Sequence, residues 1–299
     1  MRIVLHYAAS VSLAAAFLCG AASAQPGDKT ANPAEVLAAA KAASGGAAWD
    51  EHTSLHTLVG LRTGGFTGEA ERWSETRTGR SYMRFELGPM AGVLGFDGKV
   101  AWTQEPTGRT RVLDVDTEAQ LAANAAYRDQ LAFWYPSRHA AKIAYKGRSP
   151  ADGAEFDVIG ITPEGGREFE LWINTDTKMI ERLVEHEAIA TRTEIYMDWR
   201  DVEGVKIPFR VRASRGDPKS DEIVVIERIE FDGPLDQVDF SRPPAPPEQA
   251  PASPPSPVQP PSPTQPSSPA TPTSGPSLAS PPSPTQAPSA PPLPSPARR

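Results

Sequence analysis

Two histidines at short spacing are the first residues in this 299-residue chain that could do chemistry. His52 and His56 are four residues apart, a spacing that would place two metal-binding nitrogens on one face of a helix. The segment Ser54–Val59 alternates apolar and polar residues, however, which favours a strand. In a strand the two histidines share a face about two repeats apart, so we expect solvent-facing side chains and no bound metal.

Other catalytic patterns are incomplete. His186 and Glu187 begin the His-Glu-x-x-His motif of zinc hydrolases, but Ala190 stands where the second histidine belongs. The chain contains no Gly-x-Ser-x-Gly elbow, no Ser-x-x-Lys motif and no phosphate-binding glycine loop. The known motifs therefore do not indicate an enzyme.

Paired carboxylates are the remaining candidates for acid–base chemistry. Two pairs of glutamates are separated by one residue: Glu69 with Glu71, and Glu168 with Glu170. Side chains at this spacing lie on one face of a strand, where two carboxyl groups can serve as acid and base. The same spacing is typical of the solvated face of a sheet, and we expect that role here.

The N-terminal segment has the features of an export signal. Arg2 supplies a minimal basic region, and the apolar stretch Val11–Cys19 is too short to span a membrane. Ala22–Ala24 then forms a small-residue cleavage site. We expect removal of residues 1–24, a short linker over 25–31, and a soluble protein in the periplasm of a two-membrane bacterium with no transmembrane segment after processing.

The single cysteine lies inside this signal. Processing before Cys19, with lipid attachment, is the alternative to cleavage after Ala24. The bulky Leu18 disfavours it, because such processing requires a small residue before the cysteine. Cleavage after Ala24 leaves a chain without cysteine, which excludes disulfides, thiol catalysis and thiolate metal sites.

The C-terminal segment has a different composition from the rest. Residues 243–299 contain 23 prolines in 57 positions, mixed with serine, threonine, alanine and glutamine. Such a tract cannot bury enough apolar area to offset its ordering entropy, and it favours extended polyproline conformations. We predict a disordered tail that keeps the domain soluble. The alternative is a spacer or ligand that engages an envelope protein or the cell wall.

The charge balance excludes some partners. Setting aside Arg2, Glu248, Arg298 and Arg299 at the two ends leaves 27 basic against 36 acidic residues. This acidic excess argues against nucleic acid or an anionic membrane surface as the main partner.

Two helices are predicted between these ends. Asn32 is an N-cap followed by proline at the first helical position, and Gly45–Gly46 ends the run. A second helix opens at the capping box Thr117–Gln120 and must end by Tyr135, because a proline follows.

The rest of residues 32–242 reads as strands in one domain. Period-two segments are separated by glycine, aspartate, asparagine or proline turns. They predict a mostly β (α+β) domain with one strongly curved antiparallel sheet, or a barrel, of about 11–13 strands. The segments are 54–62, 66–77, 81–88, 91–96, 99–105, 109–114, 141–148, 154–161, 167–174, 178–186, 189–200, 205–213 and 222–232.

Three local motifs carry a family resemblance. Asp198–Phe209 (DWRDVEGVKIPF) is a late hairpin, Phe96–Trp102 (FDGKVAW) is a turn between strands, and Phe169–Asn174 (FELWIN) begins a strand–turn–strand. By their order and spacing along the chain, these motifs together resemble periplasmic proteins of the outer-membrane lipoprotein-carrier (lipoprotein-sorting) superfamily, over roughly 32–240.

The resemblance implies a half-barrel with two or three helices on its concave side and an apolar cavity that receives acyl chains. The bound partner would be a lipid or an acylated protein. An ordinary solid core is the alternative, because the same aromatic residues would fill it. Arg77 best matches an arginine of the family, although a solvated strand arginine is its other interpretation. The candidate cavity wall comprises Phe85, Leu131, Trp134, Phe169, Leu171 and Arg77.

A closer resemblance is to the segment that precedes retropepsin-like aspartic protease domains in some proteobacterial proteins. That protease needs an Asp-Thr-Gly or Asp-Ser-Gly loop. The two Asp-Thr pairs, at Asp116 and Asp176, lack the glycine, so we expect no protease activity.

Three functions follow as hypotheses. The first is a non-catalytic periplasmic protein that binds an apolar or acylated ligand without a cofactor. The second is an interaction module that uses its proline-rich tail, and the third is a hydrolase with no recognised motif.

Overall fold

The computed structural model describes residues 31–187 and 190–244. The chain divides into two units, Met1–Glu248 and Gln249–Arg299, and every described residue belongs to the first. The predicted signal peptide and nearly all of the proline-rich tail lie outside the described residues.

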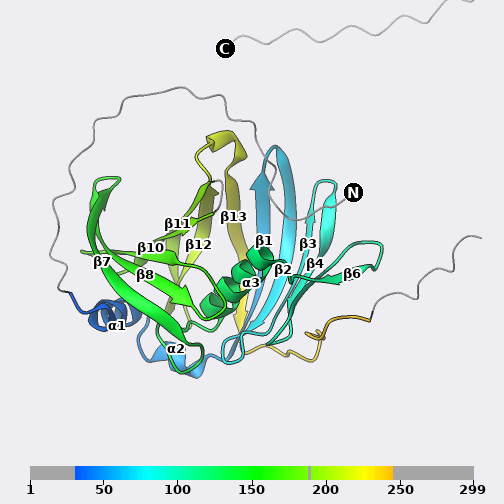
Figure 1. Ribbon diagram of the computed structural model, residues 1–299, viewed down its shortest axis with the longest axis horizontal. Helices are drawn as coiled ribbons and strands as arrows, with labels where there is room; N and C mark the ends of the chain where they lie inside the picture. Colours follow the sequence, from blue (N-terminus) through cyan, green and yellow to red (C-terminus); the bar gives the residue numbers. More distant parts are fainter. Residues whose placement is uncertain (1–30, 188–189, 245–299) are drawn as a thin grey trace, which may run out of the picture. The chain divides into compact units, whose positions relative to one another are not determined.

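The described residues form a 13-stranded antiparallel sheet, with three α-helices and one short 3₁₀ helix (Figure 1). The helices are α1 Pro33–Ala43, α2 Ala48–Glu51, α3 Asp116–Asp129 and η1 Pro218–Ser220. The strands are β1 Ser54–Thr63, β2 Phe66–Glu75, β3 Ser81–Leu87, β4 Met90–Phe96, β5 Ala101–Gln104, β6 Thr110–Val112, β7 Ala141–Ala151, β8 Ala154–Pro163, β9 Phe169–Asn174, β10 Ile180–His186, β11 Thr191–Val202, β12 Val205–Ser214 and β13 Glu222–Phe231.

The sheet order is β6-β5-β4-β3-β2-β1-β13-β12-β11-β10-β9-β8-β7. Two meanders, β1–β6 and β7–β13, are therefore joined by the pairing of β1 with β13, and the sheet is not closed into a barrel. This confirms the predicted curved antiparallel sheet, and each predicted strand overlaps an observed one. Two hairpin turns have the conformation that their sequences favour. Both residues of Asp152–Gly153 and both residues of Glu203–Gly204 have positive φ, as a two-residue type I′ hairpin requires.

The first predicted helix is confirmed, but the start of the second is wrong. Asn32 caps α1 by accepting a hydrogen bond from the backbone nitrogen of Ala34 at 3.0 Å. Helix α3 begins at Asp116, and Thr117 does not cap it. The carboxylate of Glu118, in the first turn of α3, accepts two hydrogen bonds from Arg111 of β6, at 2.7 and 3.0 Å.

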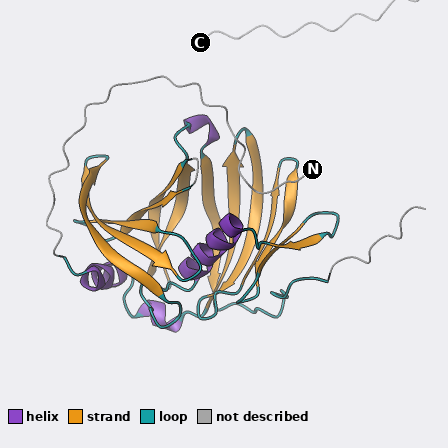
Figure 2. Cartoon of the chain, viewed as in Figure 1, coloured by secondary structure: helices purple, strands orange, loops and turns teal. Residues whose placement is uncertain are grey.

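Helices α1 and α3 pack on the same face of the sheet. Leu37 and Ala40 of α1 join Tyr127 of α3 in one core cluster with apolar residues of β8, β9 and β10. Figure 2 shows α3 lying across the hollow of the curved sheet. Ion pairs tie α3 to the other meander, through Arg72 of β2 with Asp129 and through Arg111 with Glu118. The face that carries α3 is called the helical face below.

The segment after β13 is part of the domain. Trp102 of β5 is fully buried, and its indole nitrogen donates to the backbone oxygen of Phe240 at 3.2 Å. Phe240 is itself buried, and the Arg80 guanidinium lies 5.0 Å from its ring centroid. Phe240 thus packs on β5, near the β6 edge of the sheet. The cavity described below lies in the other meander.

Replacing Phe240 with alanine is expected to lower the free energy of unfolding by about 3 kcal/mol, the low end for a buried phenylalanine. Truncation after Arg242 keeps this contact and should leave stability unchanged. Urea unfolding of the two variants beside the full chain measures both. Equal stability of the alanine variant and the full chain would show that Phe240 does not pack on Trp102.

Candidate functional site

An apolar cavity of about 230 Å³ lies on the helical face of the β7–β13 meander. Its walls come from all three α-helices or the segments next to them, and from β9, β10, β11 and β12. The lining residues are Ala40, Ser44, Trp49, Arg128, Leu131, Phe133, Trp134, Leu171, Met179, Ile180, Leu183, Tyr196, Trp199, Lys206, Ile207 and Pro208.

The chain after α3 forms the roof of this cavity. Leu131 has φ 49°, a left-handed conformation that costs a bulky side chain roughly 1–2 kcal/mol. This residue reverses the chain, and the backbone nitrogen of Trp134 donates to the oxygen of Leu131 at 2.9 Å. The Trp134 ring then packs 5.6 Å from the ring of Trp49 in α2.

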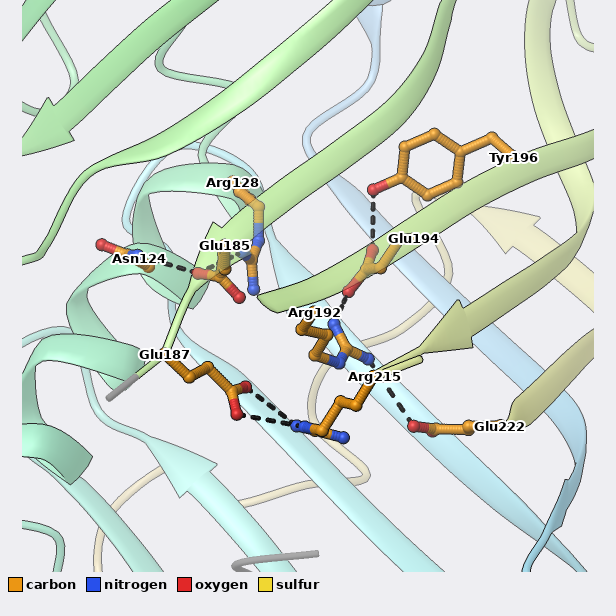
Figure 3. Close-up of polar contacts among 9 residues, drawn as sticks. All are labelled: Asn124, Arg128, Glu185, Glu187, Arg192, Glu194, Tyr196, Arg215 and Glu222. Carbon is orange, nitrogen blue, oxygen red and sulfur yellow. Dashed lines mark hydrogen bonds and ion pairs between the residues drawn. The ribbon is translucent and has the colours of Figure 1, made fainter. Parts of the chain in front are cut away.

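One end of the cavity is polar, at Arg128 and Tyr196. Arg128 donates to the carboxylate of Glu185 at 3.1 Å, and Asn124 donates to the same oxygen at 2.8 Å (Figure 3). Only 2% of Glu185 is exposed. Burial opposes its ionisation, but Arg128, Asn124, Arg192 and Arg167 outweigh that effect and lower the pKa of Glu185. Glu185 is therefore an anion at neutral pH.

Further ion pairs continue this polar cluster along the helical face (Figure 3). Arg192 pairs with Glu194 and lies 3.6 Å from Glu222, and the Tyr196 hydroxyl donates to Glu194 at 2.8 Å. Burial raises the pKa of Tyr196. Glu185 is thus held charged and the Tyr196 phenol neutral, and the hydrogen bonds of the cluster position these side chains.

The opposite end of the cavity lies at Ser44. The Ser44 backbone oxygen accepts from the Lys206 backbone nitrogen at 2.8 Å and from the Trp49 indole nitrogen at 3.1 Å. Lys206 is exposed, and its ammonium group has no carboxylate partner among residues 31–187 and 190–244. The indole nitrogen of Trp134 is buried without a hydrogen-bond partner in the same part of the chain.

Three of the predicted wall residues line this cavity: Leu131, Trp134 and Leu171. Leu131 and Trp134 both lie beyond the end of α3. The left-handed turn, not helical periodicity, brings them together. Their role in binding a ligand stays a prediction.

The other three predicted wall residues lie elsewhere. Phe169 is 0% exposed and packs in the core, 6.0 Å from the ring of Tyr127. Phe85 is buried on β3, in the other meander, and Arg77 is exposed in the turn after β2. The structure therefore places Phe85 and Arg77 away from the cavity, because the pairing of β1 with β13 puts several strands between β3 and β12.

Sequence reasoning missed Ile180, Tyr196 and Ile207, which also line the cavity. Each lies on a strand that the alternating pattern predicted. The pattern says which residues share a strand face, but not which part of that face a helix leaves uncovered.

The histidines have structural roles that differ from the prediction. His52 is buried, stacks on Phe231 at 4.0 Å, and its Nδ1 lies 2.9 Å from Asp232. His56 stacks on Trp73 at 4.5 Å, and its Nε2 lies 3.0 Å from Glu71. The prediction that both face solvent is wrong, because aromatic and carboxylate neighbours enclose them.

Two of the four carboxylate candidates pair with basic side chains. Glu71 accepts a hydrogen bond from Arg84 at 2.8 Å, and Glu168 pairs with Lys146 at 2.7 Å. Within the described residues, no group of three or more histidine, cysteine, aspartate or glutamate side chains is arranged to hold a metal ion. None of the described helices is long and apolar enough to cross a membrane.

Comparison with known proteins identifies the fold. No protein-family model matches the chain, and no curated protein is detectably similar in sequence. A LolA superfamily protein from Nitrosomonas europaea has a TM-score of 0.52 at 11% identity, covering 71% of this chain and 99% of that one. An outer membrane lipoprotein-sorting protein domain from Vibrio parahaemolyticus has a TM-score of 0.49 at 12% identity, covering 70% and 97%. The chain therefore shares its fold with a LolA superfamily structure, as the lipoprotein-carrier resemblance implied, while the link to retropepsin-like proteins stays a prediction.

Proposed function

We propose that this protein is a non-catalytic periplasmic carrier that holds the acyl chain of a lipid or acylated protein. The observation that carries the proposal is the apolar cavity between the roof residues Leu131 and Trp134 and the strand residues Leu171 and Ile207. The names of the structural neighbours, LolA superfamily and outer membrane lipoprotein sorting, agree with this kind of ligand.

The size of the cavity suits one chain. Its volume of about 230 Å³ lies just below the roughly 300–1,000 Å³ of pockets that enclose drug-sized ligands. Each methylene group moved from water into such a site contributes about 0.8 kcal/mol. An acyl chain would therefore gain affinity from length alone, and the rest of the ligand would stay outside.

The electrostatics support a binding role over a catalytic one. Among the described residues, every carboxyl group with a shifted pKa is shifted downward: Asp50, Glu75, Glu185, Asp198, Asp232 and Asp239. The shifted tyrosines and Lys41 all move upward. General acids and bases need pKa values near the working pH. A lowered carboxyl pKa and a raised tyrosine or lysine pKa both move away from neutral pH. The tail-based interaction module and the hydrolase stay hypotheses of the sequence.

A cavity-filling substitution tests the proposal. Ala40 of α1 lines the cavity, and leucine is a good helix former. We expect Ala40→Leu to weaken binding of a fluorescent fatty acid about tenfold or more, because the added side chain displaces about two methylene groups. Titration by fluorescence measures the affinity, and a thermal melt shows whether the fold is kept.

The matched control is Ala38→Leu, in the same helix but exposed. It should bind the fatty acid as the wild type does. Saturable wild-type binding that Ala40→Leu leaves unchanged would place the ligand outside this cavity, and absence of any saturable binding would refute the carrier.

A further inference from the structure

We infer that two copies of this chain associate through the face of the sheet opposite to the helical face, called the outer face below. The inference does not depend on the proposed carrier function. Helices α1 and α3 pack on the helical face, and α2 places Trp49 in the wall of the cavity on that same face. None of these three helices therefore covers the outer face of the central strands β1, β13 and β12 (Figure 1).

A single row of residues crosses this outer face, one from each of the strands β3, β2, β1, β13 and β12. Each member is the direct partner of the next across a pair of neighbouring strands, and direct partners point to the same side of a sheet. In strand order, the row is Glu86, Glu69, Gly60, Val225 and Arg210.

The alternation of side chains along each strand places this row on the outer face. Arg72 of β2 pairs with α3, and Glu69 lies three residues before it, so the two side chains point to opposite faces. On β12, the residue that follows Arg210 is the direct partner of Tyr196, which lines the cavity. Arg210 therefore points away from the cavity, as Glu69 points away from α3.

One end of the row is acidic. Glu69, Glu86 and Glu227 line a hollow there, and all three are exposed. The carboxylate of Glu227 lies over Gly60, because a Cβ on that glycine would meet Glu227 Oε1 at 2.8 Å. None of the three carboxylates forms a hydrogen bond or ion pair with another residue of the described part of the chain. This end therefore attracts a basic group.

The other end of the row is basic. Arg210 is exposed, and within residues 31–187 and 190–244 it forms no hydrogen bond or ion pair. A hydrogen bond from Arg200, and to a smaller extent the charge of Arg210, lowers the pKa of Asp198. Asp198 is thus already paired, with Arg200 at 2.6 Å, and the guanidinium of Arg210 can take another carboxylate.

The centre of the row is apolar. Val225 is 38% exposed, which is unusual for a valine on β13, the middle strand of the thirteen. An exposed apolar side chain between an acidic and a basic group is typical of a contact surface. A basic partner of another kind would match the acidic end and leave Val225 and Arg210 uncovered.

This order of charges is complementary to itself. In a two-fold dimer, residue i of one copy meets residue j of the other, and j meets i. An axis between the copies, parallel to β1 and β13 and midway between them, reverses the row of the second copy. Each Arg210 then faces the partner's Glu69, and each Val225 faces the partner's Gly60.

The spacing of the strands allows both contacts. Neighbouring strands are about 4.8 Å apart, so Arg210 and Glu69 of one copy lie about 14 Å apart, on either side of the axis. The curvature of the sheet confines the contact to the strands next to the axis. We therefore expect a weak dimer whose interface is at the small end of specific interfaces. The cavities of both copies stay on the far side of the contact.

Sedimentation of the full chain over a range of concentrations tests the inference. At low salt we expect a reversible monomer–dimer equilibrium with a dissociation constant on the order of 10–100 μM. Added salt should weaken it, because the contacts that fix its geometry are exposed charge pairs.

Charge reversal locates the contact. Arg210→Glu alone, or Glu69→Arg alone, places like charges together twice in each dimer, so the dissociation constant should rise about tenfold or more. A mixture of the two variants restores opposite charges at both contacts, and it should form a heterodimer about as strong as the wild-type dimer. The control is Lys142→Glu, at an exposed lysine on β7, which should dimerise as the wild type does.

Three results would overturn the inference. The first is a wild-type chain that stays monomeric up to about 1 mM, well above the dissociation constants expected of a weak specific contact. The second is a dimer that Arg210→Glu leaves unchanged, which would place the interface elsewhere. The third is a dimer lost in both single variants and not recovered in their mixture, which would exclude the pairing of Arg210 with the partner's Glu69. Recovery in the mixture also shows that both variants are folded.

Discussion

Replacing Phe169 with aspartate is expected to unfold the domain. The Phe169 side chain is 0% exposed and belongs to the core cluster beneath Tyr127. Truncating a buried phenylalanine costs about 3–5 kcal/mol, and burial of an unpaired carboxylate adds several more. That sum approaches the roughly 5–15 kcal/mol that stabilises an ordinary domain. Circular dichroism and urea unfolding of the purified variant measure the loss.

The matched control is the same substitution at an exposed phenylalanine. Phe66 opens β2 and is 43% exposed, so Phe66→Asp should change stability by less than about 1 kcal/mol. A Phe169→Asp variant that melts like the wild type would show that water reaches this position, and would return Phe169 to the cavity wall.

A wall residue should behave in the opposite way. Leu131 lines the cavity with φ 49°, a conformation that asparagine adopts more readily than leucine. Leu131→Asn should therefore retain the fold, while its amide lowers the affinity for a fluorescent fatty acid. The contrast between Leu131→Asn and Phe169→Asp distinguishes wall from core.

Removing the carboxylate of Glu185 is expected to have the second largest effect. Glu185→Leu should lower the free energy of unfolding by about 3–5 kcal/mol, because it leaves Arg128 without its counter-charge. Replacing both partners, as Glu185→Leu with Arg128→Met, should recover part of this loss, since a pair of apolar side chains leaves no buried charge unpaired. Chemical unfolding of the single and double variants compares them.

The pH dependence follows from the same carboxylate. The pKa of Glu185 in the folded protein lies below its usual value of 4.5, so the unfolded state binds more protons as the pH falls through this region. Glu185 therefore stabilises the fold fully above about pH 4.5, and the contribution is lost as the pH falls through the folded pKa. Glu185→Gln should lose less stability than the wild type over that interval.

An exposed glutamate provides the control for the stability and pH measurements on the Glu185 variants. Glu155 on β8 is exposed, and Glu155→Ala should keep both the stability and the acid dependence of the wild type. Wild-type stability in Glu185→Leu, or an unchanged acid profile in Glu185→Gln, would contradict an ionised and paired Glu185.

The strands could be predicted from the sequence because their signals are local. Alternation of apolar and polar residues needs only neighbours two positions apart, and a hairpin turn needs only its two central residues. Glu203–Gly204, with Val202 opposite Val205, is such a case. The start of α3 is the counter-example, since the N-cap position falls at Val115, which makes no side-chain cap hydrogen bond, and Thr117 lies inside the helix.

The cavity depended on contacts that no local pattern contains. Phe169 and Leu171 lie two residues apart on one face of β9, and the sequence presents them alike. Tyr127 of α3 covers Phe169, whereas Leu171 lines the space that the roof leaves open. His52 shows the same limit, because its partner Asp232 is 180 residues away. The sequence by itself determined the strands, their turns and the curved sheet through local periodicity. Only the tertiary structure decided which part of the helical face is core and which is cavity, because that depends on where the helices and the turn after α3 come to rest on the sheet.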